Sequence, residues 1–248
     1  MLEHSFRLDN NIIREIVTKE AVFIDFDGCF TYNGLDVHYE AMCEVLKKHA
    51  PNGLKQEPDN NKIPNIHFEK SYGEVYPEMF GIRKPETKEE LQSVIKEHLD
   101  LYNEKSRSGR VKANYKIQEV IEIANKHEIP VSILSNGKIS YIKDFLDCCN
   151  IMVKAYINNP LHQGLVLDNI YAADHVLRCD DHGNLKLSKT DLVKFYANAN
   201  GIALQNCIMF DDSYEVIEEM EKHGIKAVHV KSSNSNTMNS KHSSLTLS

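Results

Sequence analysis

Three apolar runs in this chain end abruptly in small or acidic polar residues, and this repeated pattern constrains the fold more than any other feature. The runs end with IDFD at 24–27, LSNG at 134–137 and FDD at 210–212. From Pro130 onward such runs alternate with helical patterns, which is typical of a parallel sheet covered on both faces. We therefore expect an α/β fold with a Rossmann-like parallel sheet and helices on both of its faces.

The spacing of apolar residues predicts the individual elements. Strands are expected at 21–26, 130–137, 152–157, 207–212 and 225–230. Helices are expected at 11–19, 37–49, 87–102, 115–126 and 141–146, from 189 onward, and at 215–223. Residues 165–187 follow neither pattern, and we expect them to form irregular connections.

Residues 35–110 interrupt this alternation and predict a separate insertion. Within them, Thr87-Lys88-Glu89-Glu90 stands before an apolar stripe and is a typical helix start. We expect the insertion to be a smaller, mostly helical domain, with residues 1–34 and 111–231 forming the main domain. Residues 232–248 are rich in Ser and Asn and are expected to be a disordered tail.

Composition narrows the choice of partners. The formal net charge of −7 gives no electrostatic reason to bind nucleic acid or an anionic membrane. No apolar run is long enough to span a bilayer, and the first residues lack the layout of a signal peptide. We expect no nucleic-acid or membrane partner and, by default, a cytoplasmic location. A secretion signal in the C-terminal tail and the oligomeric state stay open.

The six cysteines show no Cys-x-x-Cys spacing, which disfavours a thiolate zinc site. We expect them to be mostly buried thiols in a reducing compartment.

The three polar strand ends predict a common site. In an open parallel sheet the carboxyl ends of the strands lie along one edge, where ligands bind. Any one acidic strand end could instead cap the following helix, but three converging ends favour a site. Asp25, Asp27, Asp211 and Asp212 would crowd four carboxylates together and raise some of their pKa values. Because these motifs offer oxygen ligands, we expect Mg²⁺ rather than Zn²⁺, as in a phosphoryl-transfer site.

These residues resemble the four motifs of the haloacid dehalogenase superfamily. Asp25-x-Asp27-Gly28, a Ser ending the second strand, a Lys before a helix and a late Asp-Asp pair follow the family's order. The match covers about residues 15–34 and 111–230, and the resemblance implies that 35–110 is a helical cap inserted after the first motif. Dehalogenating members lack the second Asp of that motif, so the resemblance implies a phosphatase-type member.

The resemblance also implies roles for the core residues. Asp25 would be the nucleophile that forms an aspartyl-phosphate, and Asp27 would protonate the leaving group and then activate water. Ser135 and Asn136 would bind the phosphoryl group. Lys189 would neutralise charge on the nucleophile and the phosphoryl group, although a solvated helix start is the ordinary interpretation of such a Lys.

For the metal, the resemblance implies Asp25, Asp27, Asp211 and Asp212 as the Mg²⁺ site, with Asp27 contributing its backbone carbonyl. It leaves open which of Asp211 and Asp212 binds directly, with Asp212 favoured.

The activity expected is that of a Mg²⁺-dependent phosphomonoester hydrolase, and two alternatives stay open. A phosphomutase or phosphotransferase would use the same core residues, and a non-catalytic binding module would keep only the fold. A receiver domain is set aside because it would lack Asp25-x-Asp27 and a long insertion.

The resemblance implies that a cap of this size goes with a small phosphorylated substrate, with a phosphopeptide as the alternative. Cap residues that could touch the substrate, each more commonly ordinary surface, are His67, Lys70, Tyr72, Arg83 and Lys84.

Cys29 stands where many relatives have Thr. A small side chain packed beneath the loop is the favoured interpretation, and sensitivity of the site to oxidation is the alternative.

Overall fold

The computed structural model describes residues 8–59, 68–156, 162–172, 188–231 and 245–247. Contacts within the chain divide it into two compact units. We call them the sheet unit (described residues 8–33, 112–156, 162–172, 188–231 and 245–247) and the helical unit (34–59 and 68–111). That the helical unit acts as a cap stays a prediction.

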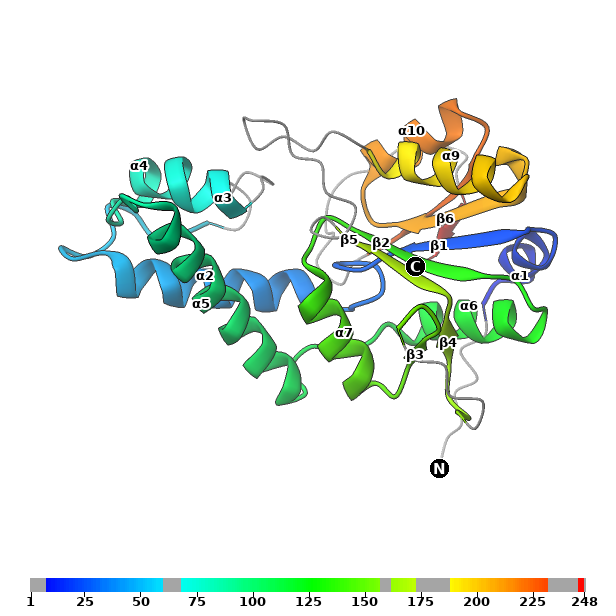
Figure 1. Ribbon diagram of the computed structural model, residues 1–248, viewed down its shortest axis with the longest axis horizontal. Coiled ribbons are helices and arrows are strands. Elements are labelled where there is room, and N and C mark those ends of the chain that lie inside the picture. Colours follow the sequence, from blue (N-terminus) through cyan, green and yellow to red (C-terminus); the bar gives the residue numbers. More distant parts are fainter. Residues whose placement is uncertain (1–7, 60–67, 157–161, 173–187, 232–244, 248) are drawn as a thin grey trace. The chain divides into compact units, whose positions relative to one another are not determined.

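The sheet unit is built on a parallel sheet of six strands, which confirms the predicted fold class (Figure 1). Its strands, in spatial order, are β5 (Asn169–Ala172), β2 (Val131–Ser135), β1 (Ala21–Asp25), β6 (Cys207–Asp211), β7 (Lys226–Val230) and β8 (Leu245–Leu247). Every neighbouring pair is parallel. All five residues of β1, β2 and β6 are buried, as expected of central strands covered on both faces.

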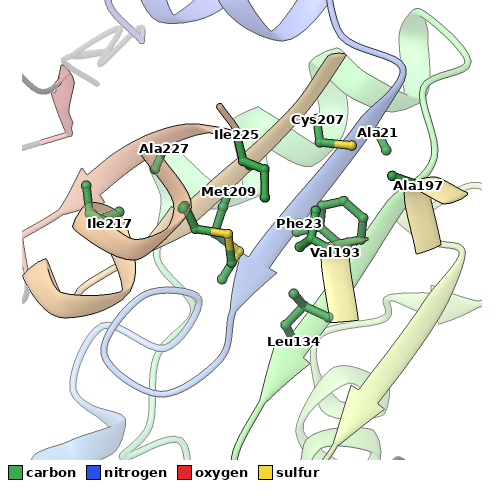
Figure 2. Packing of buried hydrophobic residues seen from close by; sticks show 11 residues of the cluster. Ala21, Phe23, Leu134, Val193, Ala197, Cys207, Met209, Ile217, Ile225 and Ala227 are labelled. Atoms are coloured by element: carbon green, nitrogen blue, oxygen red, sulfur yellow. The ribbon is translucent and has the colours of Figure 1, made fainter. Parts of the chain in front are cut away.

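Helices cover both faces of this sheet (Figure 1). They are α1 (Asn10–Val17), α6 (Tyr115–Lys126), α7 (Ile139–Cys148), α9 (Lys189–Asn200) and α10 (Tyr214–Lys222). On the face under α9 and α10, Phe23 and Met209 of the sheet pack with Val193 and Ile217 of the helices (Figure 2). No helix among the described residues is both long and apolar enough to span a membrane.

The described part of the helical unit consists of helices and their connections. These are α2 (Gly34–His49), α3 (Phe68–Lys70), a π-helical turn η2 (Ser71–Val75), α4 (Tyr76–Phe80) and α5 (Lys88–Arg107). Thr87 caps α5 by accepting a hydrogen bond from the Glu90 amide, as the sequence predicted. The buried hydroxyl of Tyr72 lies 2.7 Å from Nδ1 of His98, so this hydroxyl has a hydrogen-bond partner inside the unit. The helices between 68 and 80 were not predicted.

Two short strands correct the prediction that 165–187 is irregular. Val166–Leu167 forms β4 and Asn169–Ala172 forms β5, which pairs with β2 at the edge of the main sheet. Residues 173–187 of that segment lie outside the described residues. A four-residue strand with alternating burial is too short for periodicity to reveal.

The predictions for 152–157 and for the tail are also partly wrong. Only Met152–Val153 forms a strand, β3, which pairs with β4 in a separate two-stranded sheet. In the tail, 232–244 and 248 lie outside the described residues, but Leu245–Leu247 forms β8 beside β7. Leu247 is buried, and that contact with the sheet explains why this short apolar segment is ordered.

Candidate active site

The carboxyl ends of β1 and β6 bring three carboxylates together. Ile24 pairs with Phe210 across these neighbouring strands, so Asp25 and Asp211 follow side by side at the same edge. Asp25, Asp211 and Asp212 each offer an oxygen, and these oxygens all lie within 4.8 Å of one another. The first two are buried and Asp212 is partly exposed. Adjacent parallel strands with acidic ends therefore concentrate negative charge in one place.

Lys189 lies inside this cluster because of the way α9 begins. Ser188 and Asp191 form a reciprocal capping box, and this makes Lys189 the first residue of the helix. Its Nζ donates hydrogen bonds of 2.6 Å to Asp25 Oδ1 and 2.7 Å to Asp211 Oδ2. Its side chain is only 10% exposed, which excludes the interpretation of a solvated helix start.

The charges of the cluster shift one another's protonation. Burial raises the pKa of Asp25 well above its ordinary value, and Asp211 and Asp212 add to the rise while Lys189 opposes it. Burial also raises the pKa of Asp212, to about 7, with Asp211 contributing. For Lys189, burial acts to lower the pKa, but Asp25 and Asp211 outweigh it and raise the pKa. One ammonium group against three carboxylates leaves the cluster short of positive charge.

The acidic cluster fits Mg²⁺ by its chemistry. Its three side chains offer only hard carboxylate oxygens, at a spacing that one cation can bridge. Two of them are buried, so a bound cation would offset charge that water reaches poorly.

Asp27 follows β1 but stands apart from the three-carboxylate group. Its Oδ2 accepts a 2.6 Å hydrogen bond from the hydroxyl of Tyr141. The next residue, Gly28, has φ of +86°, a conformation that glycine adopts without strain. The turn then closes with a 3.1 Å hydrogen bond from the Phe30 amide to the Asp25 carbonyl. The glycine of the first motif is therefore required by the backbone.

The second motif ends β2 at the same edge of the sheet. Leu134 pairs with Asp25, so Ser135 is the next residue beyond that pair. Ser135 is buried, and its Oγ accepts a 3.0 Å hydrogen bond from the Gly137 amide, which orients the hydroxyl. Asn136 is exposed.

Two contacts around the cluster were missed by the sequence analysis. Tyr141 belongs to no motif, and the sequence predicted only that a helix begins there. His229 on β7 lies with its Nε2 3.0 Å from the Asp212 carbonyl, and its ring stacks on Tyr214 at 3.8 Å. Neither residue carried a sequence signal, because both contacts join segments far apart in the chain.

The prediction that Tyr72 of the helical unit could contact a substrate is wrong. Its side chain is 0% exposed and packs inside the unit, so it belongs to that unit's own core. Arg83 is exposed and pairs with Glu86 and Glu90. Lys70 and Lys84 are exposed, and His67 lies outside the described residues.

Cys29 is fully buried beneath the loop that follows Asp27. Its Sγ lies 3.4 Å from the Phe210 carbonyl, in hydrogen-bond geometry. Burial raises the pKa of this thiol well above its ordinary value, and the neighbouring carboxylates add to the rise. Because the thiolate is the reactive form, these features favour packing over oxidation sensitivity.

Neither a protein-family model nor a curated protein matches the chain. Solved structures are similar over most of its length. CbbY from Rhodobacter sphaeroides, in complex with xylulose-1,5-bisphosphate, has a TM-score of 0.67 and 12% identity, over 92% of this chain and 93% of that one. A HAD hydrolase of family IA, variant 3, from Entamoeba histolytica has a TM-score of 0.62 and 18% identity, over 87% and 86%.

A putative β-phosphoglucomutase from Thermotoga maritima is also similar, with a TM-score of 0.55 and 16% identity over 89% of this chain and 88% of that one. The chain therefore has the haloacid dehalogenase fold, as the motifs implied. At these identities the likeness establishes the fold, and the activity is inferred from the site.

Proposed function

We propose that the protein is a phosphatase of the haloacid dehalogenase superfamily, a Mg²⁺-dependent phosphomonoester hydrolase that works through an aspartyl-phosphate on Asp25. One observation carries the proposal. Lys189 bonds both Asp25 and Asp211, with Asp212 in the same group of carboxylates, at the carboxyl edge of a parallel sheet with this fold. This is a charge arrangement that suits a carboxylate attacking an anionic phosphate.

In the first step, an oxygen of Asp25 bonds to phosphorus as the bond from phosphorus to the leaving oxygen breaks. Lys189 holds Oδ1, so we assign the attack to Oδ2. Asp27, protonated, gives its proton to the leaving oxygen, which departs as an alcohol. Ser135 would bind a phosphoryl oxygen through its hydroxyl proton, since its oxygen already accepts from Gly137. Asn136 is a further candidate for phosphoryl contact.

In the second step, Asp27 accepts a proton from water, whose oxygen bonds to phosphorus. The bond between phosphorus and Asp25 breaks, inorganic phosphate leaves, and both carboxyl groups return to their starting states. Attack at phosphorus, rather than at the carboxyl carbon, leaves the oxygens of Asp25 unexchanged.

The Mg²⁺ would be held by Asp25 and Asp212 through their carboxylates and by the backbone carbonyl of Asp27. When bound, it supplies positive charge against the phosphoryl oxygens. Asp211 is the weaker candidate for a direct ligand, because Lys189 bonds its Oδ2 and the Ser213 amide donates to its Oδ1 at 2.9 Å. Asp211 would then act mainly by holding Lys189.

The substrate class we propose is a small phosphorylated metabolite. The similar structures include one with a bound sugar bisphosphate and one named as a putative β-phosphoglucomutase. The helical unit would act as a cap that excludes water during the reaction. A phosphopeptide remains the alternative substrate, and a phosphomutase remains the second candidate function because it would use the same core.

Hydrolysis of 4-nitrophenyl phosphate tests the proposal. We expect turnover with Mg²⁺ and its loss with EDTA or in Asp25→Asn. Asp100→Asn, which changes an exposed carboxylate of the helical unit, is the matched control and should retain activity. Activity that survives both EDTA and Asp25→Asn would contradict the proposal, and phosphate binding without turnover of any phosphomonoester would favour the binding module.

A panel of sugar phosphates then separates hydrolase from mutase. A hydrolase releases inorganic phosphate in proportion to substrate consumed. Isomerised sugar phosphate without release of phosphate would favour the phosphomutase.

A further inference from the structure

Tyr141 contributes a buried hydroxyl group directly to Asp27. The hydrogen bond from its hydroxyl to Asp27 Oδ2 is 2.6 Å long and joins α7 to the loop after β1, 114 residues away. The side chain of Tyr141 is 1% exposed, and its ring lies 5.6 Å from that of Phe26, between the catalytic carboxylates in sequence. A buried hydroxyl at this distance from a carboxylate is among the stronger neutral donors available to it.

Gly137 makes room for this contact. A Cβ added at Gly137 would lie 1.5 Å from the Tyr141 hydroxyl oxygen and 2.4 Å from the ring carbon that bears it. Unlike Gly28, Gly137 is not among the glycines with positive φ, so its backbone conformation does not call for glycine. The space that a side chain would fill at 137 is instead occupied by the hydroxyl of Tyr141.

We propose that Tyr141 is a positioning residue for the acid and base steps of Asp27. The inference rests on the proposed function, because it concerns the group that moves the proton. The hydroxyl proton of Tyr141 holds Oδ2 in both steps and restrains rotation of the Asp27 carboxyl group. Asp27, held in this way, gives its proton to the leaving oxygen in the first step and receives one from water in the second.

This role has a kinetic signature that a purely structural role lacks. A poor leaving group needs the proton of Asp27 to depart, whereas 4-nitrophenolate departs largely without it. Loss of alignment at Asp27 should therefore slow hydrolysis of an alkyl phosphate more than formation of the phosphoenzyme from 4-nitrophenyl phosphate. Hydrolysis of the phosphoenzyme needs Asp27 as base for either substrate.

Tyr141→Phe removes the hydroxyl oxygen and keeps the ring. We expect kcat for an alkyl phosphate to fall about tenfold with KM little changed, a part of the ~10²–10⁴-fold that acid–base catalysis contributes. With 4-nitrophenyl phosphate we expect a burst of one equivalent of nitrophenolate before slow turnover. Tyr196→Phe is the matched control, because Tyr196 packs edge-on against Phe23 of the core and should leave kcat unchanged.

A double-mutant cycle tests whether Tyr141 acts through Asp27. In an Asp27→Asn background, Tyr141→Phe should have no further effect on kcat, because the group it positions is gone. If Tyr141→Phe lowers kcat equally in both backgrounds, or slows formation of the phosphoenzyme equally for both leaving groups, the inference is wrong.

Thermal melting checks that the variants fold. Should Tyr141→Phe be unstable, Gly137→Ala tests the same contact from the other side, because the added methyl group displaces the hydroxyl from Asp27. It should slow formation of the phosphoenzyme from the alkyl phosphate more than from 4-nitrophenyl phosphate, whereas disturbance of Ser135 alone would slow that step alike for both substrates.

The positioning role of Tyr141 and the proposed phosphatase function are contradicted by different results. Wild-type turnover that needs Asp25 but is untouched by Tyr141→Phe overturns only the positioning role. Absence of any turnover that depends on Asp25 overturns the proposed function itself.

Discussion

The carboxyl group of Asp212 allows the electrostatics of the site to be tested through stability. Burial raises its pKa from 3.8 to about 7, with Asp211 adding to the shift and Lys189 opposing it. A carboxyl group whose pKa is higher in the folded state than in the unfolded state favours folding only while it is protonated. This contribution is present below about pH 4 and is lost as the pH rises through about 7.

Replacing Asp212 by Asn removes the charge and keeps the shape of the side chain. A shift of about three pKa units corresponds to on the order of 4 kcal/mol. We therefore expect Asp212→Asn to raise the free energy of unfolding of the metal-free protein at pH 8 by up to about 4 kcal/mol. For a chain of this length, each kcal/mol changes Tm by roughly 2–4 °C, so the gain in Tm should be on the order of 10 °C. The difference between the two proteins should shrink toward zero as the pH falls to about 4.

Urea denaturation in EDTA at pH 5, 6.5 and 8 measures this difference. Asp147→Asn, an exposed carboxylate on α7, is the matched control and should follow the wild type at each pH. Adding Mg²⁺ at pH 8 should narrow the gap, because a ligand that binds only the folded wild type stabilises it. The reasoning is refuted if Asp212→Asn is no more stable than the wild type at pH 8 in EDTA.

Three further outcomes follow from the geometry. Lys189→Met, which leaves two buried carboxylates without their shared partner, should lower kcat/KM for 4-nitrophenyl phosphate by at least 10²-fold, as expected for loss of one transition-state charge contact; activity within tenfold of wild type would contradict its role. Cys29→Ser should not change the rate of inactivation by peroxide, because the thiol is buried and its pKa is raised; a protected variant would instead favour oxidation at this position. Gly28→Ala, at φ of +86°, should lower the free energy of unfolding by about 1–2 kcal/mol in chemical denaturation, and an unchanged midpoint would argue against a strained turn.

The acidic strand ends could be predicted from the sequence because each follows an unbroken apolar run. A central strand buried on both faces is apolar throughout its length, so Asp25 and Asp211 mark where β1 and β6 leave the core. In the structure, β1 and β6 are parallel neighbours, and this pairing places Asp25 and Asp211 side by side. A helix from Lys189 onward was also predicted, and the capping box of Ser188 and Asp191 in the structure explains why α9 begins there.

The other features of the fold and the site depend on contacts between distant segments, which no local sequence pattern indicates. Tyr141 was predicted only as the first residue of a helix, and only the fold brings its hydroxyl to Asp27. Tyr72 was named as a possible substrate contact, but in the structure its hydroxyl lies against His98 inside the helical unit. Edge strands such as β5 and β8 gain their order from pairing with β2 and β7, which three or four residues cannot signal.

The central claim is that Asp25 accepts phosphorus, and trapping the phosphoenzyme tests it most directly. Asp27→Asn, which should slow hydrolysis of the intermediate, is mixed with 4-nitrophenyl phosphate and Mg²⁺, quenched in acid and reduced with borohydride. Peptide mass spectrometry should then find the reduced side chain, homoserine, at position 25 and nowhere else. Reduction at another carboxylate, or none in a sample that released a full equivalent of nitrophenolate, would contradict the account.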